Sequence, residues 1–332
     1  MMDTPHVDTP NRLQQAFAQL NESLQQSIIG QPHLVCCLLV ALLADGHLLV
    51  EGAPGLAKTT AVKALAGSIQ ADFHRVQFTP DLLPADLTGT DVFRPQSSVF
   101  EFERGPLFHN IVLADEINRA PAKVQSALLE AMGERQITVG RHTWPLPELF
   151  MVMATQNPIE QEGTFALPEA QLDRFIMHVT IGYPDATAEL AILQLAREQA
   201  RRHSSPQPPT TPGLSQADVF AAREAVQAVH MAPALETYLT QLVLASRDAG
   251  RYGAELKRWI AWGASPRATI ALDRCARAHA WLSGRDFALP EDVHAIAHEV
   301  LRHRVLLSYE AEAEGVRPDQ VIARLLDLVP LP

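Results

Sequence analysis

The sequence predicts a parallel αβα sheet with inserted β-hairpins, followed by a smaller all-α domain. Up to about residue 183, short apolar segments alternate with segments of helical periodicity, which is typical of a parallel sheet covered on both faces. From Ala186 onward only helical periodicity remains. A glycine-rich turn joins the first predicted strand to a helix. We therefore expect a flexible tail over residues 1–10, an α/β core over 11–183 and a helical lid domain over 184–332.

The elements of the core follow from the same periodicity. Residues 11–44 have helical spacing, interrupted at 29–31. Five apolar segments then predict strands at His47–Glu51, Phe73–Phe78, Ile111–Asp115, Phe150–Thr155 and Ile176–Ile181. Residues 182–184, with a glycine and a proline, end this pattern. Helical spacing in the second half is broken at 204–213 and again near 263–266.

Two segments of the core do not fit a simple alternation of strands and helices. Val99–Glu103 alternates apolar and polar residues before a Gly-Pro pair. Gln136–Val139 and His142–Leu146 flank Gly140 and Arg141, a pair typical of a hairpin turn. Both segments therefore predict β-hairpins inserted into the α/β scaffold.

Composition limits the classes of protein to consider. The chain has 332 residues, of which 47% are hydrophobic and 20% charged, as in ordinary globular proteins. No apolar run approaches the roughly 20 residues of a membrane span, and Asp3 and Asp8 argue against a secretory signal. The net charge of −11 disfavours nonspecific nucleic-acid binding. Cys36, Cys37 and Cys275 cannot form a disulfide framework, so we expect a cytoplasmic protein.

The turn after the first predicted strand has the pattern of a phosphate-binding P-loop. Its residues are Gly52, Ala53, Pro54, Gly55, Leu56, Ala57, Lys58 and Thr59, followed by Thr60 in the helix. Such a loop directs backbone N–H groups at phosphate oxygens, Lys58 would reach the β- and γ-phosphates of ATP, and Thr59 would bind Mg²⁺. Ala57 stands where the general pattern has glycine, and alanine is expected there only with negative φ. The alternative is an ordinary strand–turn–helix joint.

The segment Ile111–Glu116 supplies the second half of such a site. An apolar strand that ends in two carboxylates can hold hydrated Mg²⁺ and a catalytic water beside a P-loop. Asp115 would bind Mg²⁺, and Glu116 would polarise the attacking water. Acidic residues that merely end a strand and cap the next helix are the alternative. The two motifs in this order predict a nucleoside triphosphatase.

Longer segments resemble the MoxR family of AAA+ ATPases. The matching segments are Asn110–Val139, Phe78–Thr90, Leu167–Phe175, Ser265–Arg267, Leu301–Arg304 and Gly52–Thr59 with Ala57 included. The resemblance extends from about Ile29 into the helical half. It implies a P-loop AAA+ core and a helical lid with ATP between them. Ile29 and Gly30 would then contact the adenine base.

The resemblance also assigns three polar residues beyond the P-loop. Asn157 is similar to sensor 1, which orients the water, although an Asn before a Pro is also a common turn former. Arg174 is similar to the arginine finger, which acts in the site of a neighbouring subunit. An ion pair within the chain is its alternative. Arg267 is similar to sensor 2, which would reach the γ-phosphate of its own subunit; the alternative is a solvated arginine in the first turn after a Ser-Pro cap.

The resemblance further implies partners. It implies a homo-oligomeric ring, which in this family is expected to be a hexamer, and a protein client, often one with a von Willebrand factor A domain. The hairpins place the chain near magnesium-chelatase ATPase subunits and helicases of the MCM type. A nucleic-acid motor of that type and a slow nucleotide-gated scaffold are therefore the alternative functions.

Three histidines near the C-terminus are the remaining candidate metal ligands. His294 and His298 are four residues apart on a predicted helix, and His303 is close in sequence. No carboxylate or cysteine stands at a convincing third position, and Arg302 and Arg304 would repel a cation. We therefore expect a solvated helix face here.

Overall fold

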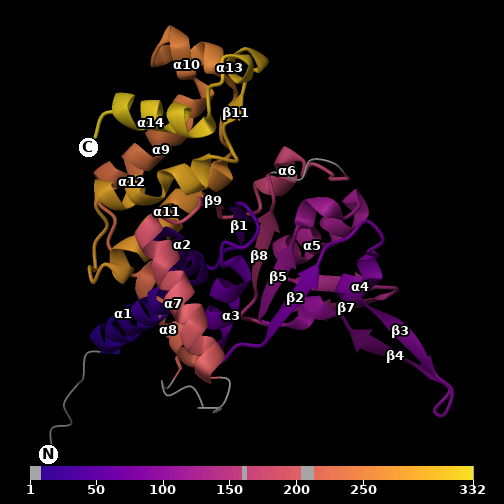
Figure 1. Ribbon diagram of the computed structural model, residues 1–332. Helices are drawn as coiled ribbons and strands as arrows, with labels where there is room; N and C mark the ends of the chain where they lie inside the picture. The colour runs from indigo at the N-terminus through magenta and orange to yellow at the C-terminus, as the bar shows by residue number, and fades with distance from the viewer. Residues whose placement is uncertain (1–8, 159–162, 203–212, 332) are drawn as a thin grey trace, which may run out of the picture.

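The computed structural model describes residues 9–158, 163–202 and 213–331. Most of the predicted tail and most of the predicted break at 204–213 lie outside these ranges. The α/β core and the helical half pack side by side, with one hairpin projecting from the core (Figure 1). No helix among the described residues has the length and apolarity needed to cross a membrane.

A five-stranded parallel sheet forms the centre of the core. Its strands are β1 (Leu48–Glu51), β2 (Phe73–Gln77), β5 (Ile111–Asp115), β8 (Met151–Gln156) and β9 (Met177–Thr180). Their order across the sheet is β2-β5-β8-β1-β9, and every neighbouring pair is parallel. Each predicted strand is confirmed, with ends that differ by at most one residue.

Both faces of the sheet are covered, as predicted. Alternate strand residues such as Leu48 and Val50 belong to one apolar cluster, and Leu49 belongs to the other. The helices of the core are α1 (Thr9–Ser27), α2 (Pro32–Leu43), α3 (Lys58–Ser68), α4 (Pro84–Thr88), α5 (Ala122–Glu134) and α6 (Glu169–Leu172). Short 3₁₀ turns at Pro106–Phe108 and Ile117–Arg119 flank β5.

The two predicted hairpins are present. They are β3 (Gly89–Arg94) with β4 (Val99–Arg104), and β6 (Gln136–Val139) with β7 (His142–Pro145). The rings of Phe102 and Trp144 stack at 4.9 Å between centroids, which joins one hairpin to the other. The β3–β4 hairpin extends beyond this contact into the solvent (Figure 1).

The second half of the chain is helical. Its helices are α7 (Ala186–Arg202), α8 (Gln216–Gln227), α9 (Pro233–Arg247), α10 (Ala254–Trp259), α11 (Pro266–Leu282), α12 (Pro290–Leu301), α13 (Tyr309–Ala313) and α14 (Pro318–Leu328), with a 3₁₀ turn at Ala249–Arg251. A small antiparallel pair, β10 (Ile260–Trp262) with β11 (Leu306–Leu307), was not predicted. Two or three residues are too few to establish a strand period.

The two halves share one apolar core. Helix α1 packs on α2 and α3 of the α/β core and also on α8 and α11 of the helical half. For example, the ring of Phe17 in α1 meets Trp281 in α11 edge to face, with centroids 5.3 Å apart. The first predicted helix therefore connects the two halves.

A buried ion pair stabilises the helical half. Asp292 is fully buried, and its carboxylate accepts hydrogen bonds from His279 at 2.7 Å and Arg285 at 2.5 Å. Burial opposes ionisation of Asp292, but these hydrogen bonds and that from the Leu289 amide outweigh it, so the pKa of Asp292 falls from 3.8 to about 2. Ionised Asp292 therefore stabilises the fold.

Asp292→Asn should lower the free energy of unfolding at pH 7 by about 2 kcal/mol or more, because the variant loses the pairing that the lowered pKa reflects. This stabilisation is fully present above about pH 4 and is lost as the pH falls towards 2. Urea unfolding of wild type and variant would measure both effects. Asp286→Asn, at an exposed position nearby, is the control and should change stability by at most about 0.5 kcal/mol. An equal loss in both variants would contradict the assignment.

Candidate functional site

The turn between β1 and α3 has the geometry of a phosphate-binding loop. A Cβ atom on Gly52 would lie 2.4 Å from Cγ1 of Ile181, so only glycine fits this close approach to the residue that follows β9. Gly55 has φ of +82° and open space around it, which leaves the loop accessible. Helix α3 begins at Lys58, so its N-terminal N–H groups face the loop.

The prediction for Ala57 is wrong. Ala57 has φ of +57° and ψ of +16°, which is the left-handed conformation that alanine was expected to avoid. This conformation costs an L-residue about 1–2 kcal/mol. The tight joint between loop and helix requires it, because the next residue already opens α3. The loop therefore stores strain at the position where the general pattern has glycine.

Lys58 lies between the loop and the acidic end of β5. Its ammonium group donates to the Gly52 carbonyl at 2.7 Å. Burial lowers the pKa of Lys58, while the charges of Asp115, Glu116 and Glu51 oppose that shift. The Lys58 ammonium group thus interacts electrostatically with both Asp115 and Glu116. It also lies where it could contact phosphates bound by the loop. Thr59 and Thr60 follow in the first turn of α3.

The two predicted carboxylates lie at the end of β5 and are held by side chains of the adjacent strands. On Asp115, Oδ1 accepts from Thr155 Oγ1 of β8 at 2.6 Å, and Oδ2 accepts from Arg75 Nη2 of β2 at 2.6 Å. On Glu116, Oε2 accepts from Gln77 of β2 at 2.7 Å.

Arg119 also donates to the same Glu116 oxygen, at 3.1 Å. The backbone N–H of Glu116 donates to Thr155 Oγ1 at 2.9 Å. Arg75, Gln77 and Thr155 were not predicted as site residues.

Asn157 follows the last residue of β8 and is buried. Because β8 lies between β5 and β1, Asn157 stands at the same edge of the sheet as the P-loop and the two carboxylates. This position suits the orientation of a water molecule between phosphate and Glu116. The residues at this edge also suit Mg²⁺, since the Thr59 hydroxyl and the Asp115 carboxylate are oxygen ligands of the kind that it prefers.

A pocket of about 320 Å³ adjoins the P-loop. Ile29, predicted to contact adenine, lines it together with Gly55 and Thr60. Six further lining residues were not predicted, and they lie at the junction of the core with the helical half and in α7: Tyr183, Pro184, Glu189, Ile192, Leu195 and Ala196. Gly30 does not line this pocket; its φ of +80° and close contact with Pro184 fix the turn beside it. The mixed apolar lining suits a nucleobase.

Arg174 lies at the opposite edge of the sheet. It precedes the first residue of β9, whereas the P-loop follows the last residue of the adjacent parallel strand β1. The guanidinium group donates to the Leu129 carbonyl of α5, and Gly133 leaves room for it. Within the described ranges Arg174 forms no ion pair, so the alternative of an intrachain pair finds no support.

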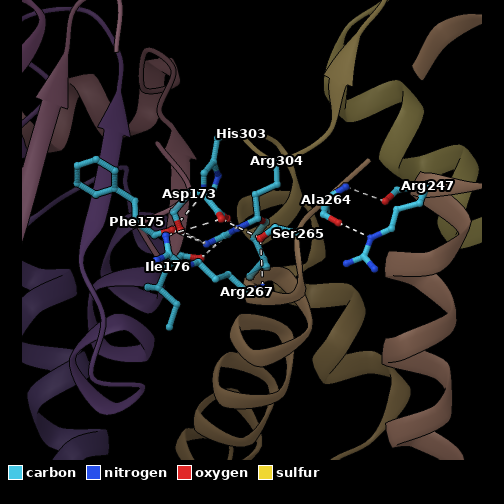
Figure 2. Close-up of polar contacts among 11 residues, drawn as sticks. Asp173, Phe175, Ile176, Arg247, Ala264, Ser265, Arg267, His303 and Arg304 are labelled. Carbon is cyan, nitrogen blue, oxygen red and sulfur yellow. Dashed lines mark hydrogen bonds and ion pairs between the residues drawn. The ribbon is translucent and has the colours of Figure 1, made fainter. Parts of the chain in front are cut away.

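Arg267 lines the same groove as Arg174. Figure 2 shows Arg267 close to Asp173 and Ser265. Ser265 caps α11 as predicted, accepting from the Arg267 N–H at 3.2 Å. The guanidinium of Arg267 is half exposed, 3.9 Å from Asp173. Since this is the edge of the sheet away from the P-loop, the prediction that Arg267 reaches the γ-phosphate of its own chain is wrong. The packing of α11 against the segment before β9 determines this position.

Arg174 and Arg267 line a groove of about 380 Å³. Its charged lining consists of Asp45, Arg135, Asp173, Arg174, Arg267, Arg274 and Arg304. Five arginines against two aspartates make the groove cationic in a chain of net charge −11. Arg274 is exposed and, among the described residues, has no ion pair. Such a surface suits an anionic ligand.

The three C-terminal histidines have separate partners. His294 lies 2.8 Å from the Tyr238 hydroxyl, and His298 lies 3.4 Å from Asp319. His303 is buried and lies 3.0 Å from the Phe175 carbonyl, so the expectation of a solvated face is wrong for this residue. It is buried because the segment after α12 packs on the segment before β9.

Known proteins resemble this chain over nearly its whole length. Residues 47–177 match the ATPase family associated with various cellular activities (AAA), and residues 256–325 match the AAA lid domain. The chaperone MoxR1 of Mycobacterium tuberculosis is 45% identical over 93% of this chain and 80% of its own length. The protein MoxR of Paracoccus denitrificans is 33% identical over 100% of this chain and 99% of its own length. A crystal structure of an ATPase from Cytophaga hutchinsonii superimposes with a TM-score of 0.88, at 43% identity over 98% of this chain and 97% of that one.

Proposed function

The chain belongs to the MoxR family of AAA+ ATPases and hydrolyses ATP, and from this premise we propose that it works as a ring in which neighbouring copies share each ATP site. The ring, for which a hexamer is the family expectation, would remodel or activate a protein client. The observation that carries the proposal is the separation of the P-loop and Arg174 at opposite edges of one sheet. A head-to-tail contact between copies brings such edges together.

Within one chain, ATP would lie between the core (11–183) and the helical lid (184–332). The P-loop amides and Lys58 would bind the phosphates, and the pocket beside Ile29 would take the base. Glu116 would accept a proton from the attacking water, which Asn157 orients. Thr59 and Asp115 would hold Mg²⁺, which neutralises charge on the phosphate oxygens when bound.

Across the contact, the neighbouring chain would contribute cations. Arg174 would leave its carbonyl on α5 and approach the γ-phosphate of the adjacent chain. Arg267, on the same cationic groove, would act beside it in that adjacent site. This trans role replaces the role in its own chain that the family resemblance implied.

The client surface would include the β3–β4 hairpin. Phe93, Val99 and Phe100 are exposed near its end, where a large apolar surface is unusual unless it meets a partner. A protein with a von Willebrand factor A domain is the client class that the resemblance suggests. A cytoplasmic location accords with Cys37 and Cys275, which are buried free thiols.

The hairpin argues against a nucleic-acid motor. Arg94, near its end, pairs with Glu101 at 3.2 Å and lies 4.0 Å from Glu103. The carboxylates therefore offset its charge, and Arg141 is the basic residue at the turn of the second hairpin. Nonspecific binding of a nucleic-acid backbone needs unneutralised cations.

ATPase activity per chain should rise with protein concentration and reach a plateau, because a site shared between copies is complete only after assembly. Steady-state phosphate release, measured beside sedimentation at the same concentrations, would check this. Single-stranded and duplex DNA should leave the rate unchanged.

A rate per chain that is independent of concentration would show an ATPase that works alone. Stimulation by DNA would favour the nucleic-acid motor. ATP binding without turnover at any concentration would favour the nucleotide-gated scaffold.

A further inference from the structure

We propose that Arg304 is a positioning residue for Arg174, through which the helical half sets the place of the arginine finger. The inference rests on the proposed function, because it concerns the residue that would act in the neighbouring chain. Arg304 follows α12 and crosses from the helical half to the segment 173–176, which carries Arg174 and leads into β9 (Figure 2). Nothing in the reaction itself requires an arginine at this place.

All three nitrogens of the Arg304 guanidinium donate hydrogen bonds within the protein. Its Nε donates to Asp173 Oδ1 at 2.7 Å. One terminal nitrogen donates to the carbonyls of Val300 and Ile176, and the other to the carbonyls of Asp173 and Phe175. The side chain is only 3% exposed. Four of these five hydrogen bonds end on the segment that brackets Arg174.

Asp173 receives a second set of contacts from α11. Ser265 donates to Asp173 Oδ2 at 2.8 Å, and Arg267 lies 3.9 Å from the same oxygen. The carboxylate next to the finger is thus held by Arg304 on one oxygen and by the start of α11 on the other. Both contacts come from the helical half.

Separating the helical half from the segment that carries Arg174 would therefore cost a large free energy. Removing one partner of a buried, hydrogen-bonded ion pair leaves the other charge desolvated and unpaired. His303 adds a contact to the Phe175 carbonyl; burial lowers the pKa of His303, which keeps the ring neutral. The backbone on both sides of Arg174 therefore follows the helical half, while its guanidinium rests on α5.

Arg304→Lys tests the proposal, because lysine keeps the charge but lacks the planar fork that reaches several carbonyls. We expect kcat for ATP hydrolysis to fall about 10-fold or more, since small displacements of a positioned group cost that much. KM for ATP should change little, because the binding pocket lies at the other edge of the sheet. Asp173→Asn, which keeps the size of the side chain, should act in the same direction.

Arg302→Lys is the matched control. Arg302 lies two residues away, and its side chain is 13% exposed. Its guanidinium also crosses to the core, but it bonds the His178 carbonyl within β9 and Asp319. We expect a comparable loss of thermal stability in both lysine variants but a large loss of kcat only in Arg304→Lys. Equal losses of kcat would overturn the positioning role.

A double-mutant cycle separates this proposal from the ring mechanism. If Arg304 acts through Arg174, the double variant Arg304→Lys/Arg174→Ala should be no slower than Arg174→Ala alone. If the double variant instead lost activity by the product of the two single-variant factors, the positioning role would be overturned. The proposal of an ATP site shared between chains would still stand. An Arg174→Ala variant with normal activity would instead overturn the shared site, and the positioning role with it.

Discussion

Glu116→Gln is expected to lower the rate of ATP hydrolysis by about 10²–10⁴-fold while ATP still binds, because the amide cannot accept the proton of the attacking water. The substitution should leave the local geometry in place. Gln77 and Arg119 both donate to one Glu116 oxygen, and an amide oxygen can accept the same two hydrogen bonds. Single-turnover hydrolysis and equilibrium binding of ATP, measured on the same preparation, would separate chemistry from affinity.

The control for Glu116→Gln is Glu224→Gln, at an exposed position on α8 far along the chain from the site. It removes one negative charge as well, so it reports any effect of net charge on assembly. Its rate should match wild type. Retention of more than about a tenth of the activity in Glu116→Gln would mean that another group activates the water.

The inner strands of the core, β1, β5 and β8, could be predicted because they are buried on both faces. Leu48–Val50 and Ile111–Ala114, for example, form continuous apolar runs bounded by polar or glycine residues, and the structure places them in the centre of the sheet. The pair β10–β11 could not be predicted, since its two short strands show no period. The packing of α1 on α11 could not be predicted either, because periodicity identifies the apolar face of a helix but not the element that it packs against.

Local parts of the site were predictable for a similar reason. The P-loop and the pair Asp115–Glu116 are runs of consecutive residues at strand ends, so one segment contains the whole pattern. Arg75 and Gln77 could not be predicted as site residues. They contact Asp115 and Glu116 because β2 is the neighbour of β5, and strand order is not visible in a local pattern.

Two predictions failed where tertiary packing overrides local preference. Ala57 adopts a positive φ that its side chain disfavours, because the loop geometry demands it. Arg267 was assigned to its own site by resemblance of a short segment. The docking of α11 on Asp173 determines which edge of the sheet it faces, and no local pattern contains that information.

Arg174→Ala should reduce ATP hydrolysis by about 10³-fold or more, the usual effect of removing an arginine finger. ATP binding by the same chain should persist, because Arg174 lies at the edge of the sheet away from the P-loop and its guanidinium donates to the Leu129 carbonyl of α5. The fold should also persist, since the side chain is only partly buried and forms no ion pair in the described part of the chain.

Mixing variants tests whether the finger acts between copies. Lys58→Ala chains lack a working P-loop but keep Arg174, whereas Arg174→Ala chains have the reverse defect. In randomly mixed head-to-tail rings of equal parts, about a quarter of the sites would combine an intact P-loop with an intact finger, so activity should return to about that fraction of wild type.

The control mixture contains Arg174→Ala with the double variant Lys58→Ala/Arg174→Ala, in which no finger exists, and it should stay inactive. Restoration in the first mixture alone requires that Arg174 and Lys58 serve one site from two chains. Failure of both mixtures, with assembly confirmed by sedimentation, would confine Arg174 to its own chain. The placement of Arg174 and Arg267 away from their own P-loop would then need a domain rearrangement to reach it, and the cationic groove would lose its proposed ligand.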